Sequence, residues 1–308
     1  MADESEPSLF VDARQAPPRE LTRLSPRVRR LIAPNASPFT FNGTCTYIVG
    51  ESAVAVVDPG PADPSHLAAI LSAAEGERVE TILVTHTHRD HSALANDLRQ
   101  ATGARIVGPP PFQPKGDDAG LDSSHDRAYA PDAVLTDGER LAARTFTMEA
   151  VATPGHCGDH LCLALLEERA LFSGDHVMAW STPIVAPPDG AMSDYMASLA
   201  KLAQRSEPIY LPGHGGPVRD APRFVRSYIE HRKAREASIL HRLDKGAADI
   251  PTLVRAIYIG LDPRLTGAAA LSVLAHLEDL VARGLVATDG APTIGGIYRL
   301  TELPRPAA

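Results

Sequence analysis

The segment from Thr85 to His91, which reads THTHRDH, constrains this chain more than any other. It directly follows an apolar run, ETILVT, that is typical of a buried strand. Imidazole and carboxylate groups suit zinc and similar divalent cations. On a turning backbone, His86 and His88 point to one side, whereas Asp90 and His91 can turn toward a second point. The pattern therefore predicts a metal site and favours two adjacent metals over one.

A single motif supplies too few ligands for two metals, so further ligands are expected at other strand ends. Three more strand-like runs lead into Gly- or Pro-marked turns that carry a ligand-type residue: His156 in TPGH, Asp175 in SGDH and His214 in PGHG. Such turns let the backbone fold closely around a small site. The alternative, ordinary solvated loop histidines, does not explain why the same pattern recurs at four strand ends.

The rest of the chain alternates predicted strands and helices. Strands are expected at residues 44–49, 53–57, 80–85, 145–153, 161–166, 170–172 and 209–211, and helices at 64–75, 93–101, 195–205 and 221–245. The N-cap candidates of the four helices are Asp63, Ser92, Ser193 and Asp220. Residues 1–25 are expected to form an irregular arm, and residues 108–138 a long surface loop.

Residues 246–308 are predicted to form a separate small module. Two helices, at 252–258 and 268–283, precede two strands, at 285–288 and 297–301, which is a winged-helix pattern. The module carries five basic and six acidic residues. A reader of duplex DNA needs excess Lys and Arg to neutralise phosphates, so no duplex DNA partner is expected. A wall of the substrate cleft or a contact between subunits is the favoured role.

Composition excludes several classes of protein. The 308 residues carry a net charge of −8, so no global basic field recruits nucleic acid. Three cysteines are an odd number without a repeated spacing, which favours a reducing compartment over a disulfide framework. The N-terminus lacks the apolar core of a signal peptide, and no uninterrupted apolar run reaches about 18 residues. We therefore expect a cytoplasmic protein with no membrane partner, whose oligomeric state is left open.

The order HxHxDH, TPGH, GD and GHG resembles the metallo-β-lactamase superfamily over about residues 35–220. The DPG sequence that begins at Asp58 also matches the strand end typical of that superfamily. The resemblance implies an α/β (α+β) fold, namely a four-layer αββα sandwich with the metal site in its cleft. The expected organisation is this domain over residues 1–220, a connecting helix at 221–245 and the winged-helix-like module at 246–308.

The resemblance also implies the ligand set and the chemistry. Carried over residue by residue, it assigns His86, His88 and His156 to one metal, Asp90, His91 and His214 to the second, and Asp175 to both. A hydroxide between the metals would be the nucleophile, with a pKa lowered to about 7, and Asp90 would also orient it as the catalytic residue. We expect two Zn²⁺ per chain, although this ligand set also accepts Mn²⁺ or Fe.

A finer resemblance is to the β-lactamase-like-protein-2 family, which joins this domain to a C-terminal winged helix. The matching segments are residues 35–49, 58–61 and 174–190. Antibiotic-degrading relatives carry Cys or Ser where this chain has Asp175, which instead resembles glyoxalase II, lactonases and nucleases. The sequence departs from the family at Cys157, where Thr commonly follows the Gly-His pair.

Three functions remain in consideration. The leading one is hydrolysis of a small ester or thioester. The alternative is a single-strand-selective endoribonuclease, which is the activity of the animal member of the family. The 221–245 helix has seven basic and three acidic residues, and the basic ones could hold RNA phosphates. A solvated helix face explains the same charges as well. The remote alternative is a non-catalytic, metal-stabilised binding module.

A few other residues near the motifs have two interpretations each. Cys157 adjoins His156 and is more simply a small buried residue than a ligand. His160 and His176 could hydrogen-bond to ligands or merely pack. Trp180, the single tryptophan, is expected to pack structurally or to line the cleft.

Overall fold

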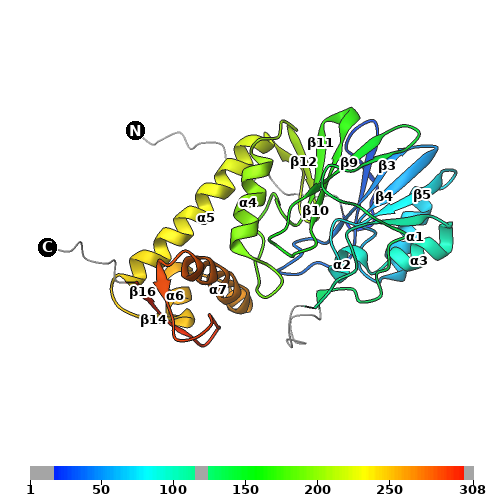
Figure 1. Cartoon of the computed structure of the whole chain (residues 1–308). Coiled ribbons are helices and arrows are strands. Elements are labelled where there is room, and N and C mark those ends of the chain that lie inside the picture. Colours follow the sequence, from blue (N-terminus) through cyan, green and yellow to red (C-terminus); the bar gives the residue numbers. More distant parts are fainter. Residues whose placement is uncertain (1–16, 115–123, 302–308) are drawn as a thin grey trace, which may run out of the picture.

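A computed structural model describes residues 17–114 and 124–301 of the chain. Two β-sheets pack face to face with helices on their outer faces, and a long helix leads from them to a small C-terminal module (Figure 1).

The first sheet has seven strands in sequence order. The first three pairings are antiparallel and the last three are parallel. Its strands are β1 (Thr22–Arg23), β2 (Val28–Ile32), β3 (Cys45–Glu51), β4 (Ala53–Val57), β5 (Arg78–Leu83), β6 (Arg105–Gly108) and β7 (Ala133–Val134). Apolar residues occupy both faces of β3 and β4, as expected for strands that are covered on both sides.

The second sheet has the order β13-β12-β11-β10-β9-β8, and only the β11–β12 pairing is parallel. Its strands are β8 (Arg140–Ala142), β9 (Thr147–Ala152), β10 (Leu161–Leu165), β11 (Ala170–Gly174), β12 (Ile209–Pro212) and β13 (Val218–Arg219). A one-turn 3-10 helix, η2 (Leu166–Glu168), links β10 to β11.

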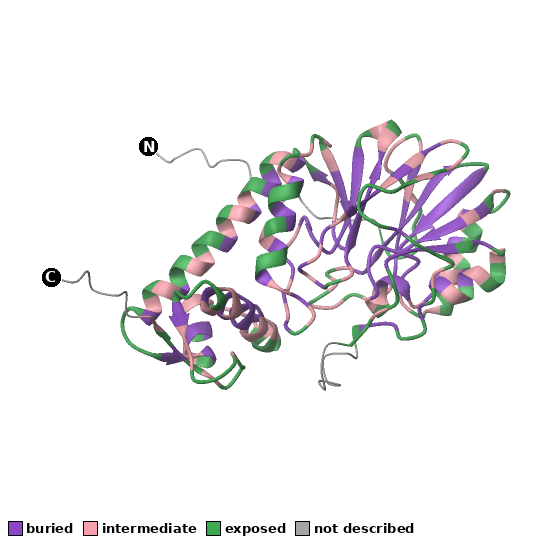
Figure 2. Ribbon diagram, viewed as in Figure 1, coloured by how far each residue is buried: buried purple, intermediate pink, exposed green. Residues whose placement is uncertain are grey.

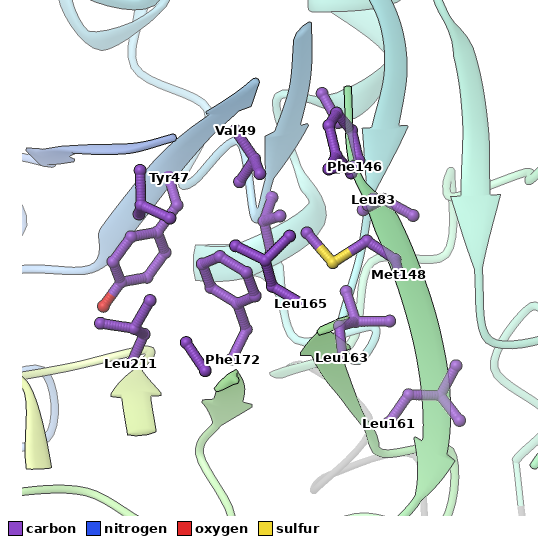
Figure 3. Packing of buried hydrophobic residues seen from close by; sticks show 14 of the residues in the cluster. Tyr47, Val49, Leu83, Phe146, Met148, Leu161, Leu163, Leu165, Phe172 and Leu211 are labelled. Carbon is purple, nitrogen blue, oxygen red and sulfur yellow. The ribbon is translucent and has the colours of Figure 1, made fainter. Parts of the chain in front are cut away.

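The core between the sheets is apolar and closely packed. Figure 3 shows Tyr47 and Val49 on one side, facing Leu163, Leu165 and Phe172 on the other. The rings of Tyr47 and Phe172 meet edge to face with centroids 5.1 Å apart. Alternation along each strand sends these side chains inward and their neighbours outward, beneath the helices.

Helices cover both outer faces, which confirms the four-layer αββα sandwich. Helices α1 (Pro64–Ala73), α2 (Arg89–Ser92) and α3 (Ala95–Thr102) lie on the first sheet, and α4 (Met192–Leu202) and α5 (Ala221–Leu243) lie on the second. Asp63 caps α1 as predicted, because its carboxylate accepts hydrogen bonds from the backbone N–H groups of Ser65 and His66.

Helix α5 takes part in two separate cores. Phe224 and Tyr228, in its first half, pack on the second sheet. Ile239 and Leu243, near its end, pack inside the C-terminal module. Figure 2 shows buried positions along the whole helix, which therefore links the sandwich to the module.

The C-terminal module has the helices and strands of a winged helix. It contains β14 (Ala248–Asp249), α6 (Ile250–Ile257), η3 (Pro263–Leu265), α7 (Thr266–Ala282), β15 (Val286–Ala287) and β16 (Ile297–Leu300), with an antiparallel sheet ordered β14-β16-β15. Among the described residues, only Pro263–Ala282 forms a helix long and apolar enough to cross a membrane. Its apolar side chains, such as Val273 and Leu277, are buried in the module's own core.

Several local predictions are wrong. The irregular arm contains β1, which pairs with β2, although residues 1–16 lie outside the described part. Ser92 ends α2 and does not cap α3, because its hydroxyl donates to backbone carbonyls instead. Helix α4 begins at Met192, before the predicted cap Ser193. Asp220 does occupy the N-cap position of α5 as predicted, but its side chain makes no cap hydrogen bond.

The predicted loop at 108–138 also differs in part. It contains β7, which extends the first sheet by pairing with β6. Residues 115–123 of this segment lie outside the described part.

Candidate metal centre

The predicted ligands follow the carboxyl ends of strands in both sheets. The THTHRDH segment follows β5, His156 follows β9, Asp175 follows β11 and His214 follows β12. These strands run in the same direction within each sheet, so their ends meet at one edge of the sandwich. All seven predicted residues are brought together there.

Asp58, directly after β4, holds the start of the motif in place. Its Oδ1 accepts a hydrogen bond from the Thr85 backbone N–H at 2.8 Å, and its Oδ2 accepts one from the Thr85 hydroxyl at 2.8 Å. The same Oδ2 lies 3.0 Å from Nδ1 of His91. From the sequence, Asp58 was predicted only as a strand end; its carboxylate at the end of a strand next to β5 is the signal that indicates this role.

Three imidazole nitrogens converge in the first group of ligands. Nδ1 of His88 lies 3.0 Å from Nε2 of His86 and 3.2 Å from Nε2 of His156. The Nδ1–H of His156 donates to the Ile184 carbonyl at 2.6 Å, so its Nε2 carries the lone pair.

The tautomer of His86 follows from a similar chain of bonds. The Thr85 hydroxyl gives its only proton to Asp58, so it accepts from Nδ1–H of His86 at 3.0 Å. The lone pair of His86 is therefore on Nε2, toward the other two rings. Such hydrogen bonds fix ring orientation around metals in proteins.

The second group joins one carboxylate and two imidazoles. Oδ2 of Asp90 lies 3.4 Å from Nε2 of His91 and 3.3 Å from Nε2 of His214. The Thr44 hydroxyl donates to the same Asp90 oxygen at 3.0 Å. Since Nδ1–H of His91 points to Asp58, its Nε2 offers a lone pair to this group.

Asp175 lies between the two groups. Its Oδ2 is 3.3 Å from Nε2 of His214 and 3.7 Å from Nε2 of His156, and its Oδ1 is 3.5 Å from Nε2 of His91. One carboxylate thus reaches both ligand sets, which is the position that a bridging ligand would take.

The electrostatics of the site favour a bound cation. Burial would lower the pKa of His214, but the Asp175 and Asp90 carboxylates outweigh it and raise that pKa to about 9. They also raise the pKa of His91 well above its usual value, against the effect of burial. The buried atoms His91 Nε2 and Asp175 Oδ1 make no hydrogen bond with any described residue. These unpartnered donor atoms and this excess negative charge fit divalent metal ions.

Glycines make room for the ligands. A Cβ on Gly213 would lie 2.5 Å from Cε1 of His91 and 2.6 Å from Oδ1 of Asp175. Gly174 has φ +47, and a Cβ there would lie 2.5 Å from Nε2 of His160. The backbone can approach the ligands this closely only where a side chain is absent.

His160 supports the site, whereas His176 does not bond to it. Nε2 of His160 accepts from the Asp175 backbone N–H at 3.1 Å, so its Nδ1–H donates to the Thr153 hydroxyl at 2.9 Å. Neither ring nitrogen of His176 makes a hydrogen bond with a described residue; the ring packs on Tyr195.

Cys157 is buried beside the first group, and burial raises the pKa of its thiol well above the usual value. Its Sγ also lies close to the ligand atoms of His86, His88 and His156, so the cysteine is buried but could also contact a metal held by that group. The sequence analysis missed His125, whose ring stacks on Phe112 and whose Nδ1 lies 2.7 Å from the Thr87 hydroxyl.

A cavity of about 430 Å³ opens from the ligands toward the C-terminal module. Asp90, His156, Asp175 and His214 line one side. Trp180, stacked on Phe41 at 5.1 Å, also lines it, so its role is not packing alone. The opposite side comes from α5, from the segment 258–265 that follows α6, and from α7.

Comparison with known proteins agrees with this fold. The model of the metallo-beta-lactamase superfamily matches residues 39–214, and the chain belongs to that superfamily. The beta-lactamase associated winged helix domain matches residues 250–295. The chain is therefore a metal-dependent hydrolase with an appended winged helix.

Two relatives illustrate the range of this group. The beta-lactamase-like protein 2 homolog of Caenorhabditis elegans is 34% identical over 226 residues, which cover 71% of this chain and 72% of that protein. An atrochrysone carboxyl ACP thioesterase of Aspergillus fumigatus is 30% identical over 261 residues, which cover 78% and 76%.

Solved structures share the fold over nearly the whole chain. A metallo-beta-lactamase family protein from Thermus thermophilus has a TM-score of 0.74 at 25% identity and covers 91% of this chain and all of its own. A beta-lactamase domain protein from Burkholderia ambifaria has a TM-score of 0.77 at 21% identity, with coverages of 95% and 97%.

Proposed function

We propose that this protein hydrolyses a small ester or thioester at a dinuclear zinc site. The observation that carries the proposal is the pair of ligand groups that share Asp175 and open into one partly apolar cavity. His86, His88 and His156 would hold one metal, and Asp90, His91 and His214 the other. The thioesterase of A. fumigatus supports the substrate class, because it matches most of this chain.

The chain's own residues prepare the site. Bound zinc would lower the pKa of a water to about 7 and polarise a carbonyl oxygen. Asp58 and Thr85 orient the rings of His91 and His86 through the hydrogen bonds described above. The Thr44 hydroxyl donates to Oδ2 of Asp90, which leaves the other carboxylate oxygen to orient an attacking water. Met178, Trp180 and Ile184 line the cavity and restrict the water around an acyl group.

Cleavage of single-stranded RNA is the second candidate, and the basic α5 helix favours it. Two of its basic residues, Arg232 and Arg235, line the cavity, whereas Arg223, Arg226 and Lys233 are exposed and do not. The free, buried cysteines fit the cytoplasmic location that we propose for either activity.

The test is a paired turnover assay on zinc-loaded protein, with Asp90→Asn as the blank. One arm offers a labelled single-stranded RNA, and the other a panel of acyl thioesters and esters. We expect thioester turnover that is lost in the blank, with intact RNA.

RNA cleavage that is lost in the blank would instead assign the protein to the nuclease candidates. Zinc binding without turnover in either arm would favour the non-catalytic binding module. Zinc content is measured on every sample, so that a poorly loaded preparation is recognised.

A further inference from the structure

Helix α5 places a buried arginine in the wall of the cavity. Arg232 is only 3% exposed, yet it lines the cavity. Its guanidinium donates one hydrogen bond to the Pro183 carbonyl and lies over the Tyr195 ring at 4.9 Å. Its buried Nε makes no hydrogen bond with a described residue. A buried cation with so few partners is unfavourable unless an anion joins it.

A second arginine lies one turn further along the same face. Arg235 is half-buried, lies over the Tyr258 ring at 4.3 Å and donates to the Ile257 carbonyl. No described carboxylate forms an ion pair with Arg232 or Arg235. The acids on the same helix have other partners: Glu236 binds Arg283 at 2.6 Å, and Glu230 binds Lys233 at 3.1 Å.

Arg232 and the predicted metal ligand His156 contact the same short segment. Arg232 bonds to the carbonyl of Pro183, and His156 bonds to the carbonyl of the next residue, Ile184. Adjacent Cα atoms are about 3.8 Å apart, so the two side chains meet neighbouring peptide units. An extended small molecule can therefore reach both from within the cavity.

The wall beyond the arginines is apolar. Tyr258, Leu261, Leu265 and Ala268 of the C-terminal module line the cavity together with the arginines. The carboxylates that line it, Asp90, Asp175 and Asp189, come from the sandwich domain instead. Apolar surface beside paired guanidiniums suits an acyl chain or ring that carries a carboxylate.

We propose that Arg232 and Arg235 bind the carboxylate of an acidic acyl group, so that the preferred substrates are ester or thioester derivatives of dicarboxylic acids. This proposal rests on the proposed function for the bond that is cleaved, but the anion site itself does not. A polar pantetheine-like thiol arm fits the apolar wall less well than an acyl chain does, which places the acid on the acyl side.

The first test measures binding without turnover. The single tryptophan, Trp180, lines the cavity, so its fluorescence reports on occupancy. The probes are 2-naphthoate and its neutral amide, 2-naphthamide, titrated with and without zinc. We expect naphthoate to bind roughly 10- to 100-fold more tightly, the range of a charge-assisted hydrogen bond. The preference should persist without zinc and disappear in Arg235→Gln.

The second test measures turnover of a matched pair, adipoyl and neutral adipamoyl thioesters of one thiol, by the zinc-loaded enzyme. Arg235→Gln should raise KM for the adipoyl substrate roughly tenfold or more and change KM for the adipamoyl substrate little. Arg232→Met is the second variant. Arg226→Gln is the matched control, because Arg226 is exposed on the same helix and does not line the cavity. Circular dichroism and thermal melting check the fold of each variant.

The outcomes separate this proposal from the proposed function. Arginine-dependent naphthoate binding without any thioester turnover would overturn only the function. Two outcomes would overturn the acid site. In the first, the wild-type enzyme has the same kcat/KM for the acidic and the neutral thioester. In the second, folded Arg235→Gln loses kcat/KM equally for both substrates. Displacement of naphthoate by inorganic phosphate at equal concentration would assign a general phosphate site and contradict the acyl carboxylate.

Discussion

The two sides of the cavity are built in different ways. The sandwich side carries the short polar side chains at strand ends, and hydrogen bonds fix several of them, as Asp58 fixes Thr85 and His91. The side formed by α5 and the C-terminal module is mainly apolar and carries two long arginines. Rigid strand ends suit the chemical step, whereas a wall from an added module can vary with the substrate. The comparison predicts that damage to the first side abolishes catalysis, whereas damage to the second changes specificity.

The largest effect is expected from Asp90→Asn. It replaces a carboxylate oxygen that accepts from Thr44 and faces His91 and His214. Turnover should fall roughly 10³-fold or more, while the melting temperature changes by no more than about 3 °C. Steady-state kinetics and calorimetry measure both. Near-normal activity in the folded variant would refute the role given to Asp90.

Asp58→Asn is expected to weaken metal binding on the sandwich side. The amide cannot accept from Thr85 and His91 as the carboxylate does, so both ring orientations loosen. Zinc affinity should fall roughly 10- to 100-fold, as for other residues that orient ligands. Competition with a chromogenic chelator measures it. Asp63→Asn is the matched control, since Asp63 caps α1 away from the site; equal losses in both variants would contradict the specific role.

A pH effect on stability is expected behind the module side, at His276 of α7. Burial, and then Arg232 and Arg235, lower the pKa of this imidazole to about 3. The unfolded chain binds a proton there below about pH 6.5, whereas the folded chain does not, so stability is lost as pH falls from 6.5 toward 3. At pH 5 the loss from this residue is about 2 kcal/mol relative to pH 7.5.

Urea denaturation at pH 7.5 and 5.0 tests this expectation. His276→Leu should be less sensitive to acid than the wild type by about that amount. The exposed His241→Leu serves as the control and should keep the wild-type dependence. An unchanged pH dependence in His276→Leu would show that the imidazole is not held neutral.

The smallest effect is expected from Ala268→Phe, which fills part of the apolar wall. KM for a long acyl thioester should rise roughly tenfold, whereas turnover of an acetyl thioester and the zinc affinity stay near wild type. Steady-state kinetics on the two substrates, with a parallel zinc titration, decide it. A loss of acetyl turnover as large as the loss on the long substrate would remove the distinction between the two sides of the cavity.

The sandwich was predicted from the resemblance to the metallo-β-lactamase superfamily. Local sequence patterns predicted the helix–helix–hairpin order of the module and the set of residues gathered at the strand ends, because strand patterns and Gly- or Pro-marked turns lie within a few residues of the ligands they present. The prediction that Ser92 caps the next helix is wrong, because tertiary packing directs its hydroxyl to the backbone carbonyls of Thr87 and His88 in the metal motif.

Which atoms meet could be learned only from the folded chain. It showed which ring nitrogens face the site, because their partners, Ile184 for His156 and Asp58 for His91, lie 28 and 33 residues away along the chain. The structure also showed that Arg232 and Arg235 line the cavity, which the sequence pattern of α5 does not distinguish from its other basic residues. The reason is physical: one helix turn decides whether an arginine faces water or a cavity, and that depends on what packs against the helix.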